Sequence, residues 1–294
     1  MTVAANEGTL LNLIVAFTAY FYFMPEHIVE GAPFPRGHPY GYVEDSADEP
    51  QFDPAIHLEL TAPLWIKPLI SEHSRTHGDH PVQFPVPVRA SAGGRVTSLG
   101  PNGGSMPFSG LAFTSAFKVL SDEGVRVMRE CIKRNEKFAK DNERQPKSLR
   151  GLGYRSKFIR DFTYCPQVLQ HLARMCGHPV HPQDMCMNIA QINFGNVGEK
   201  RPVDRWHLDS VPYVMVVLLS DATDMVGGKL KVARIEDPQE ALRQVLAEDV
   251  DPAALESVNY PGPGHAIFMQ GSRIAHTATP VISAREPRLT LVNS

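Results

Sequence analysis

The sequence has few cysteines, and their spacing defines no structural site. Four Cys occur in 294 residues, and none belongs to a Cys-x-x-Cys pair. This spacing excludes a zinc ribbon and a dense disulfide framework. Sparse cysteine is typical of a reducing compartment, so we expect free, buried thiols in a cytoplasmic protein.

Neither sign of charge is in excess. The 29 Lys and Arg against 32 Asp and Glu give a formal net charge of −3. Because no long-range basic field is present to attract polyphosphate, nucleic acid is not expected as a partner. Hydrophobic residues make up 43% of the chain, enough to bury a substantial core. We therefore expect a globular protein that binds a small-molecule substrate, as a monomer or a homodimer.

Long hydrophobic runs are also lacking. The one segment that could indicate a membrane, Thr9 to Met24, would form a helix of about 24 Å. A bilayer's hydrocarbon core is about 30 Å thick. The first basic residue is Arg36, so the cationic start of a signal peptide is missing as well. We expect this run to be a buried helix or strand, and no membrane partner.

The first part of the chain is predicted to be an irregular arm that packs on the core. From Gly31 to about Gly110 the sequence is dense in Pro, Gly, His and acidic residues, with few periodic apolar stretches. Such composition disfavours long helices. We therefore predict two regions, this arm over residues 1–110 and a second region over residues 111–294.

Helix signals begin after residue 120. Ser121 can cap a helix whose first turn carries two carboxylates and whose apolar residues fall on one side. A second helix is predicted over Pro166 to Met175, ending near Gly177, and a third over Asp237 to Asp249. The stretch Lys133 to Arg150 is charged, and we expect it to be solvated.

From Met187 onward the chain is a series of short strand-like runs separated by Gly, Pro and Asp. The runs are MNIAQINF, VPYVMVVLLS, KLKVARI, HAIFMQ, RIAHTATPV and PRLTLVN. This pattern is typical of a sandwich or barrel. The predicted class is α+β with a mainly β core, in which helices of the N-terminal half pack against an antiparallel C-terminal sheet.

His207 and Asp209 lie two residues apart, immediately before the apolar run Val211 to Leu219. On a strand, this spacing places both side chains on one face. With a second His, they would complete the 2-His-1-carboxylate set of non-haem Fe(II) enzymes. The same spacing occurs in His77-Gly-Asp79 and His57-Leu-Glu59, but neither pair leads into a long buried strand.

Two further residues follow in the strand-rich region. His276 lies in the middle of a strand-like run, and Arg288 opens the last one. Alternation places Arg288, Thr290 and Val292 on one face of that strand. A guanidinium in a desolvated position requires an anion, and bidentate geometry favours a carboxylate. A dicarboxylate ligand is therefore predicted.

These motifs resemble the phytanoyl-CoA hydroxylase and ectoine hydroxylase branch of the Fe(II)/2-oxoglutarate-dependent oxygenases. The resemblance rests on Trp-His-x-Asp, a Gly-Gly-x-Leu strand entry, a Gly-x-Ala-Ile-Phe strand, a distal His and an Arg about a dozen residues later. It implies a double-stranded β-helix (jelly roll) within residues 111–294. It also implies Fe(II) held by His207, Asp209 and His276, with O2 and the co-substrate 2-oxoglutarate, whose distal carboxylate pairs with Arg288.

The resemblance also indicates helpers for the co-substrate. A hydroxyl two residues after the Arg often contacts the same carboxylate, and Thr290 occupies that place, although it also suits an ordinary strand. In MNIAQINF the apolar residues alternate, which leaves Gln191 and Asn193 together on the other face. These two amides either bind the co-substrate or complete the hydrogen bonds of a half-exposed sheet.

The sequence specifies the substrate least. Arg155 and Arg160 could bind a substrate anion, or belong to a solvated basic face, and Tyr213 could form a wall of the cavity. We expect hydroxylation of a small polar metabolite such as an amino acid derivative. Desaturation and ring closure would use the same iron site. Halogenation is disfavoured, because the oxygenases of this group that halogenate typically have a small residue in the place of Asp209, which admits chloride.

Two other functions stay open at this stage. The cluster His73, His77, Asp79 and His80 resembles part of the zinc signature of metallo-β-lactamase-like hydrolases, with Arg75 in place of the first His. A zinc-dependent hydrolase would use that cluster. The second alternative is a jelly-roll protein that binds a metal or ligand without oxidising anything.

Overall fold

The computed structural model describes residues 49–70, 109–183 and 189–294. The apolar run Thr9 to Met24 and the histidine cluster around His77 lie outside these residues. Among the described residues, no helix is both long and apolar enough to cross a membrane. Three of the four cysteines are described, and each is a buried free thiol, as predicted.

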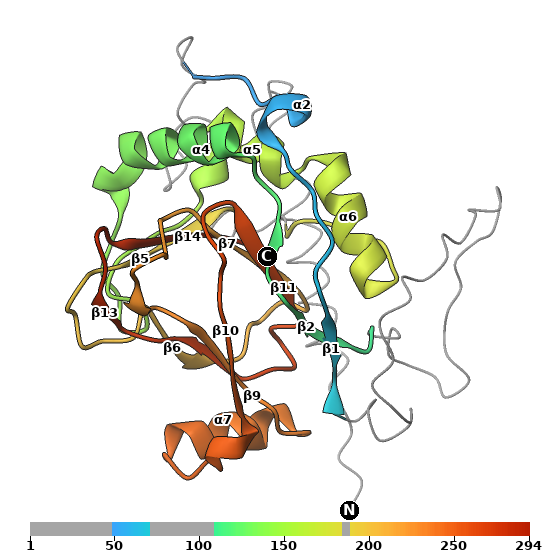
Figure 1. Cartoon of the computed structure of the whole chain (residues 1–294), viewed down its shortest axis with the longest axis vertical. Coiled ribbons are helices and arrows are strands. Elements are labelled where there is room, and N and C mark those ends of the chain that lie inside the picture. Colours follow the sequence, from blue (N-terminus) through green and yellow to red (C-terminus); the bar gives the residue numbers. More distant parts are fainter. Residues whose placement is uncertain (1–48, 71–108, 184–188) are drawn as a thin grey trace, which may run out of the picture. The chain divides into compact units, whose positions relative to one another are not determined.

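The larger of the main sheets is antiparallel and has eight strands (Figure 1). Its order is β1-β2-β11-β7-β14-β5-β4, with β3 paired to β11. The central strands β7, β11 and β14 are long apolar runs because they have a paired neighbour on each side and a covered face. The strands are β1 (Ile66–Pro68), β2 (Leu111–Thr114), β3 (Phe117–Lys118), β4 (Ser148–Leu149), β5 (Gln191–Gly195), β7 (Val214–Leu218), β11 (His265–Met269) and β14 (Arg288–Asn293).

A smaller antiparallel sheet of four strands has the order β10-β9-β12-β6. A third pair joins β13 to β8. These strands are β6 (Asp204–His207), β8 (Val226–Gly227), β9 (Leu230–Ala233), β10 (Leu255–Val258), β12 (His276–Ala278) and β13 (Val281–Ser283).

The helices begin and end where the capping residues predict. The Ser121 hydroxyl accepts a hydrogen bond from the Gly124 amide at the start of α4, and Gly177 ends α6 with a φ of 80°. Helix α7, whose first turn is capped by Asp237, packs on β6 and β9 (Figure 1). The helices are α2 (Pro54–His57), α4 (Asp122–Asn135), α5 (Lys157–Thr163), α6 (Pro166–Cys176) and α7 (Pro238–Leu246), with 3₁₀ turns η1 (Glu136–Phe138), η2 (Leu152–Tyr154) and η3 (Pro252–Ala254).

One core cluster joins the two main sheets. Phe113 and Ile267 of the large sheet pack in the same buried cluster as Leu230 and Val232 of the small sheet. Burial of apolar side chains from both sheets holds them against each other, at roughly 25 cal/mol per Å² of apolar surface removed from water. The polar site described below lies where residues of both sheets line one pocket.

The mainly antiparallel β core flanked by helices confirms the coarse prediction of fold class. The jelly-roll topology and the boundary at residue 110 stay predictions. The stretch Lys133 to Arg150 was expected to be solvated, and this is wrong in part, because Gln145 and Leu149 are buried and Ser148–Leu149 form β4. Pairing of this stretch with β5 explains the burial.

The placement of the His-x-Asp pair also differs from the prediction. His207 ends β6 of the small sheet, whereas β7 belongs to the large sheet, so the chain crosses between sheets after His207. Asp209 lies in this crossing, outside any strand, where its amide donates to the carbonyl of Gly271 at 3.0 Å. The two side chains nonetheless converge.

Candidate metal centre

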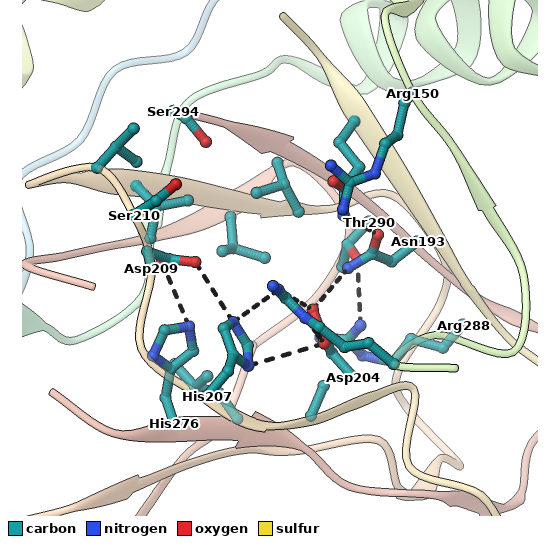
Figure 2. Close-up of a pocket in the computed structure, with 18 residues that line it drawn as sticks. Arg150, Asn193, Asp204, His207, Asp209, Ser210, His276, Arg288, Thr290 and Ser294 are labelled. Atoms are coloured by element: carbon teal, nitrogen blue, oxygen red, sulfur yellow. Dashed lines mark hydrogen bonds and ion pairs between the residues drawn. The ribbon is translucent and has the colours of Figure 1, made fainter. Parts of the chain in front are cut away.

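Three side chains from two distant parts of the sequence converge in one pocket. His207, Asp209 and His276 each offer a ligand atom, and these atoms lie within 4.8 Å of one another. His207 Nε2 is 3.3 Å from Asp209 Oδ1, and His276 Nε2 is 3.4 Å from Asp209 Oδ2 (Figure 2). Two imidazoles and a carboxylate are the donor set of non-haem Fe(II) sites with open coordination positions.

Strand pairing brings the two histidines together. His276 of β12 is the direct antiparallel partner of His207 of β6, and their ring centroids are 4.1 Å apart. Cross-strand partners have their side chains on the same face of the sheet. The sheet therefore fixes two ligands at once, without help from a loop.

Hydrogen bonds to the backbone set the tautomer of both rings. His207 Nδ1 lies 2.6 Å from the carbonyl oxygen of Arg205, and His276 Nδ1 lies 2.8 Å from that of Ile274. Since a carbonyl oxygen only accepts, each Nδ1 carries the proton and donates it. In the neutral ring each Nε2 then keeps a lone pair, and each lies within 3.4 Å of an Asp209 carboxylate oxygen, the arrangement that metal-binding histidines require.

The Nε2 atoms of the two histidines and the carboxylate of Asp209 lie close together, an arrangement of acceptors that a cation stabilises. Asp209 Oδ2 is buried and has no hydrogen-bond partner among the described residues. Burial raises the pKa of Asp209, but the neighbouring His276, His207 and Arg144 outweigh this effect and lower that pKa to about 2. Burial lowers the pKa of His276. An ionised carboxylate beside two imidazoles fits a divalent metal ion.

Arg288 of β14 lies in the same pocket. Its side chain is buried, its Nη1 donates to Thr290 Oγ1 at 3.1 Å, and its Nε has no partner among the described residues. Burial lowers its pKa. Gly228, with a φ of 62°, leaves room for the aliphatic part of the Arg288 side chain, because a Cβ at this glycine would lie 3.0 Å from the Arg288 Cδ. A desolvated guanidinium with an unused donor favours an anionic ligand.

The amides predicted on β5 line the pocket but already have protein partners. Gln191 Nε2 donates to Asn193 Oδ1 at 2.6 Å, and Asn193 Nδ2 lies 3.4 Å from Asp204 Oδ2. Asn193 is the cross-strand partner of Thr290. The apolar part of the lining comes mainly from Val211, Val214, Val216, Leu230 and Val292.

Three charged residues of the pocket were missed by the sequence analysis. Asp204, which is buried, binds Arg144 through two hydrogen bonds of 2.5 and 2.8 Å, and Arg144 Nη2 lies 2.7 Å from His207 Nε2. Between the pairs Ala278–Asp204 and His276–His207, strand β6 advances three residues and β12 only two. This bulge turns Asp204 toward the same pocket as His207, against simple alternation. Arg150 also lines the pocket.

The tentative substrate residues lie elsewhere. Arg155 stacks on the Phe138 ring at 3.8 Å, Arg160 donates to the carbonyl of Gly153, and Tyr213 packs on Phe268. None of the three is among the described residues that line the pocket.

The two other places with the His-x-Asp or His-x-Glu spacing, which begin at His57 and His77, have different outcomes. His57 ends α2 and packs against aromatic rings, with its centroid 4.9 Å from that of Phe158. His77 and the rest of the zinc-hydrolase cluster, His73, Asp79 and His80, lie outside the described residues.

No protein-family model matches the sequence, and no curated protein matches it. Solved structures are similar to it. The non-heme alpha-ketoglutarate-dependent carbocyclase SnoK from nogalamycin biosynthesis is 13% identical, with a TM-score of 0.46 over 62% of this chain and 78% of SnoK. EctD from S. alaskensis, solved with bound Fe, is 16% identical, with a TM-score of 0.43 over 59% of this chain and 68% of EctD.

A third similar structure is EvdO2 from Micromonospora carbonacea var. aurantiaca, complexed with 2-oxoglutarate. It is 16% identical, with a TM-score of 0.41 over 62% of this chain and 84% of EvdO2. The solved structures similar to this chain thus include non-heme iron, 2-oxoglutarate-dependent enzymes, the group that the sequence motifs resemble. With these identities and with TM-scores below 0.5, the likeness itself assigns no activity to the chain.

Proposed function

We propose that this protein is an Fe(II)- and 2-oxoglutarate-dependent oxygenase that hydroxylates an unactivated C–H bond of a small polar metabolite. The observation that carries this proposal is the coexistence, in one pocket, of a three-donor metal cluster and a buried guanidinium. His207, Asp209 and His276 supply the donors, and Arg288 supplies the guanidinium.

In this proposal His207, Asp209 and His276 hold Fe(II). When bound, a ferrous ion on this donor set supplies oxygen activation coupled to oxidative decarboxylation of a keto acid. The chain's own part is to keep both Nε2 lone pairs unprotonated, through the hydrogen bonds of Nδ1 to the carbonyls of Arg205 and Ile274.

Arg288 and Thr290 would hold the distal carboxylate of 2-oxoglutarate. The guanidinium supplies charge and geometry, and the Thr290 hydroxyl, which already contacts Arg288 Nη1, adds a short polar contact on the same strand face. Asn193 and Gln191 would form the polar wall beside them. This pairing would neutralise a guanidinium that is costly to leave buried alone.

The pocket that the metal ligands and Arg288 line is small. Its volume is about 130 Å³, below the roughly 300–1,000 Å³ of typical drug-sized ligand sites. Valine and leucine side chains on β7, β9 and β14 would exclude water from the reacting C–H bond. We also propose that the two main sheets form the double-stranded β-helix of such oxygenases.

The test is turnover of the co-substrate. With Fe(II), 2-oxoglutarate, air and a panel of small polar metabolites, we expect one substrate to be hydroxylated with formation of one succinate and one CO2 per O2 consumed. His207→Ala and Asp209→Ala should abolish this turnover while the circular dichroism spectrum is retained. A protein that binds Fe(II) and 2-oxoglutarate but forms no succinate with any substrate would instead be the non-oxidising binding protein.

A further inference from the structure

Arg144 contacts the proposed metal centre at an unexpected point. Its Nη2 lies 2.7 Å from His207 Nε2, the nitrogen that lies 3.3 Å from Asp209 Oδ1. Because His207 Nδ1 carries the ring proton, Nε2 accepts this hydrogen bond from the guanidinium. The guanidinium therefore occupies the lone pair that a metal ion on His207 would need.

The position of Arg144 is fixed by several contacts. Its Nε and Nη2 bind both carboxylate oxygens of Asp204, and its carbonyl accepts from the Arg205 amide at 3.3 Å. Asn142 Oδ1 accepts from the Arg144 and Gln145 amides at 3.0 and 2.9 Å, and Gln145 Nε2 donates to Asp204 Oδ2 at 2.8 Å. The contact with His207 is thus built by its loop and by Asp204.

We infer that Arg144 is a placeholder cation, which holds His207 in ligand geometry in the metal-free protein and is displaced from Nε2 when the metal binds. This inference rests on the metal site of the proposed function. One lone pair cannot serve both partners, since a metal ion would bond to the same Nε2 at about 2.0–2.1 Å, closer than the 2.7 Å of the Arg144 donor. Asp204 would keep the displaced guanidinium beside the site.

The inference predicts two opposite effects of removing the guanidinium. Without Arg144, the metal-free protein loses the charge-assisted bonds to Asp204 and the bond to His207, so its stability should fall. Metal binding no longer has to break the bond to Nε2, so affinity for the metal should rise. A residue with only a structural role would instead lower both quantities.

The experiment is an anaerobic titration of the full chain with Mn(II), followed by calorimetry, together with the melting temperature of the metal-free protein. For Arg144→Met we expect Mn(II) to bind about five- to twenty-fold more tightly than to the wild type, and the metal-free melting temperature to fall. An unchanged or weaker Mn(II) affinity would overturn the inference.

Two further variants separate competing causes. Arg144→Lys keeps the charge but lacks the planar fork that reaches Asp204 and His207 together, so it should bind Mn(II) more tightly than the wild type, as Arg144→Met does. Wild-type affinity in the Lys variant would mean that charge repulsion alone is responsible, which contradicts the inference. The double variant Arg144→Met/Asp204→Asn must keep the tighter binding; otherwise the freed Asp204 carboxylate has become a new ligand.

Failure of this inference is distinguishable from failure of the proposed function. If the wild type binds Mn(II) and His207→Ala loses it, the metal site stands, and the Arg144 variants alone decide the inference. If the wild type and His207→Ala bind Mn(II) equally weakly, the metal site itself is wrong and the placeholder role falls with it.

Discussion

Gly271 lies directly against the carboxylate of Asp209. A Cβ built on Gly271 would be 2.0 Å from Asp209 Oδ2 and 2.8 Å from its Cγ. The carbonyl of the same glycine accepts the Asp209 amide. The turn before β12 therefore fixes both the backbone and the side chain of the carboxylate ligand, and only a residue without a Cβ fits there.

Gly271→Ala should consequently push the Asp209 carboxylate out of line with the two imidazoles. We expect Mn(II) affinity to fall by about tenfold or more, in the range seen when the support of a ligand is lost. The fold should be retained, which a matched variant, Gly262→Ala, can calibrate because nothing lies within 4 Å of a Cβ at Gly262. Equal Mn(II) affinities for the two alanine variants would contradict this role of Gly271.

Arg288→Met should separate stability from binding. Removing a buried guanidinium with an unpartnered Nε should raise the melting temperature of the ligand-free protein, since similar-sized apolar replacements of buried charges are often stabilising by about 1–4 kcal/mol. The same variant should weaken 2-oxoglutarate binding by about 2–5 kcal/mol. Scanning calorimetry of the ligand-free protein measures the first effect, and titration calorimetry with 2-oxoglutarate in the presence of Mn(II) measures the second. If Arg288→Met binds 2-oxoglutarate with wild-type affinity, Arg288 does not belong to the binding site.

The pair Arg129–Glu286 ties α4 to the turn before β14. Two hydrogen bonds of 2.9 and 2.5 Å join the side chains, and Glu286 also accepts the Asp221 amide at 2.7 Å. Hydrogen bonding to Arg129 lowers the pKa of Glu286, with burial opposing it. A lowered carboxylate pKa stabilises the fold above the unfolded-state pKa, and this stabilisation is lost as the pH falls through the folded-state pKa.

Glu286→Gln should therefore lower the unfolding free energy at neutral pH by about 1 kcal/mol, and the difference from the wild type should shrink as the pH falls below the ordinary glutamate pKa of about 4.5. Urea unfolding at several pH values measures it. Glu123→Gln, in the exposed pair with Arg126, is the control and should change little. A difference that grows toward acid pH would contradict the sign of the linkage.

Local patterns predicted the parts of the site that lie on regular strands. Alternation along β14 and β5 placed Arg288, Thr290, Gln191 and Asn193 on the faces that line the pocket. Alternation is local, so it can be read before the partner strands are known. The pairing of His276 with His207 depends on strands that are distant in sequence, and only the family resemblance indicated it.

The rest of the site depends on tertiary contacts, which cannot be predicted from composition or from local sequence patterns. Asp204 faces the pocket because of a bulge in β6, which reverses its expected side. Arg144 lies in a charged stretch that was expected to be solvated, and its ion pair with Asp204 spans sixty residues of sequence. In the sequence Asp-Arg-Trp-His, an acidic residue lies three positions before the ligand His207 and could have indicated Asp204. No local rule connects Asp204 to Arg144.

The convergence of His207, Asp209 and His276 on one metal ion is the central claim, and anaerobic Fe(II) binding tests it most directly. The wild type should bind one Fe(II) per chain, and His276→Ala should weaken binding by more than about a hundredfold. His265→Ala, at the start of β11, is the matched control and should bind as the wild type does. If His276→Ala binds Fe(II) with wild-type affinity and stoichiometry, the three side chains do not form the metal centre.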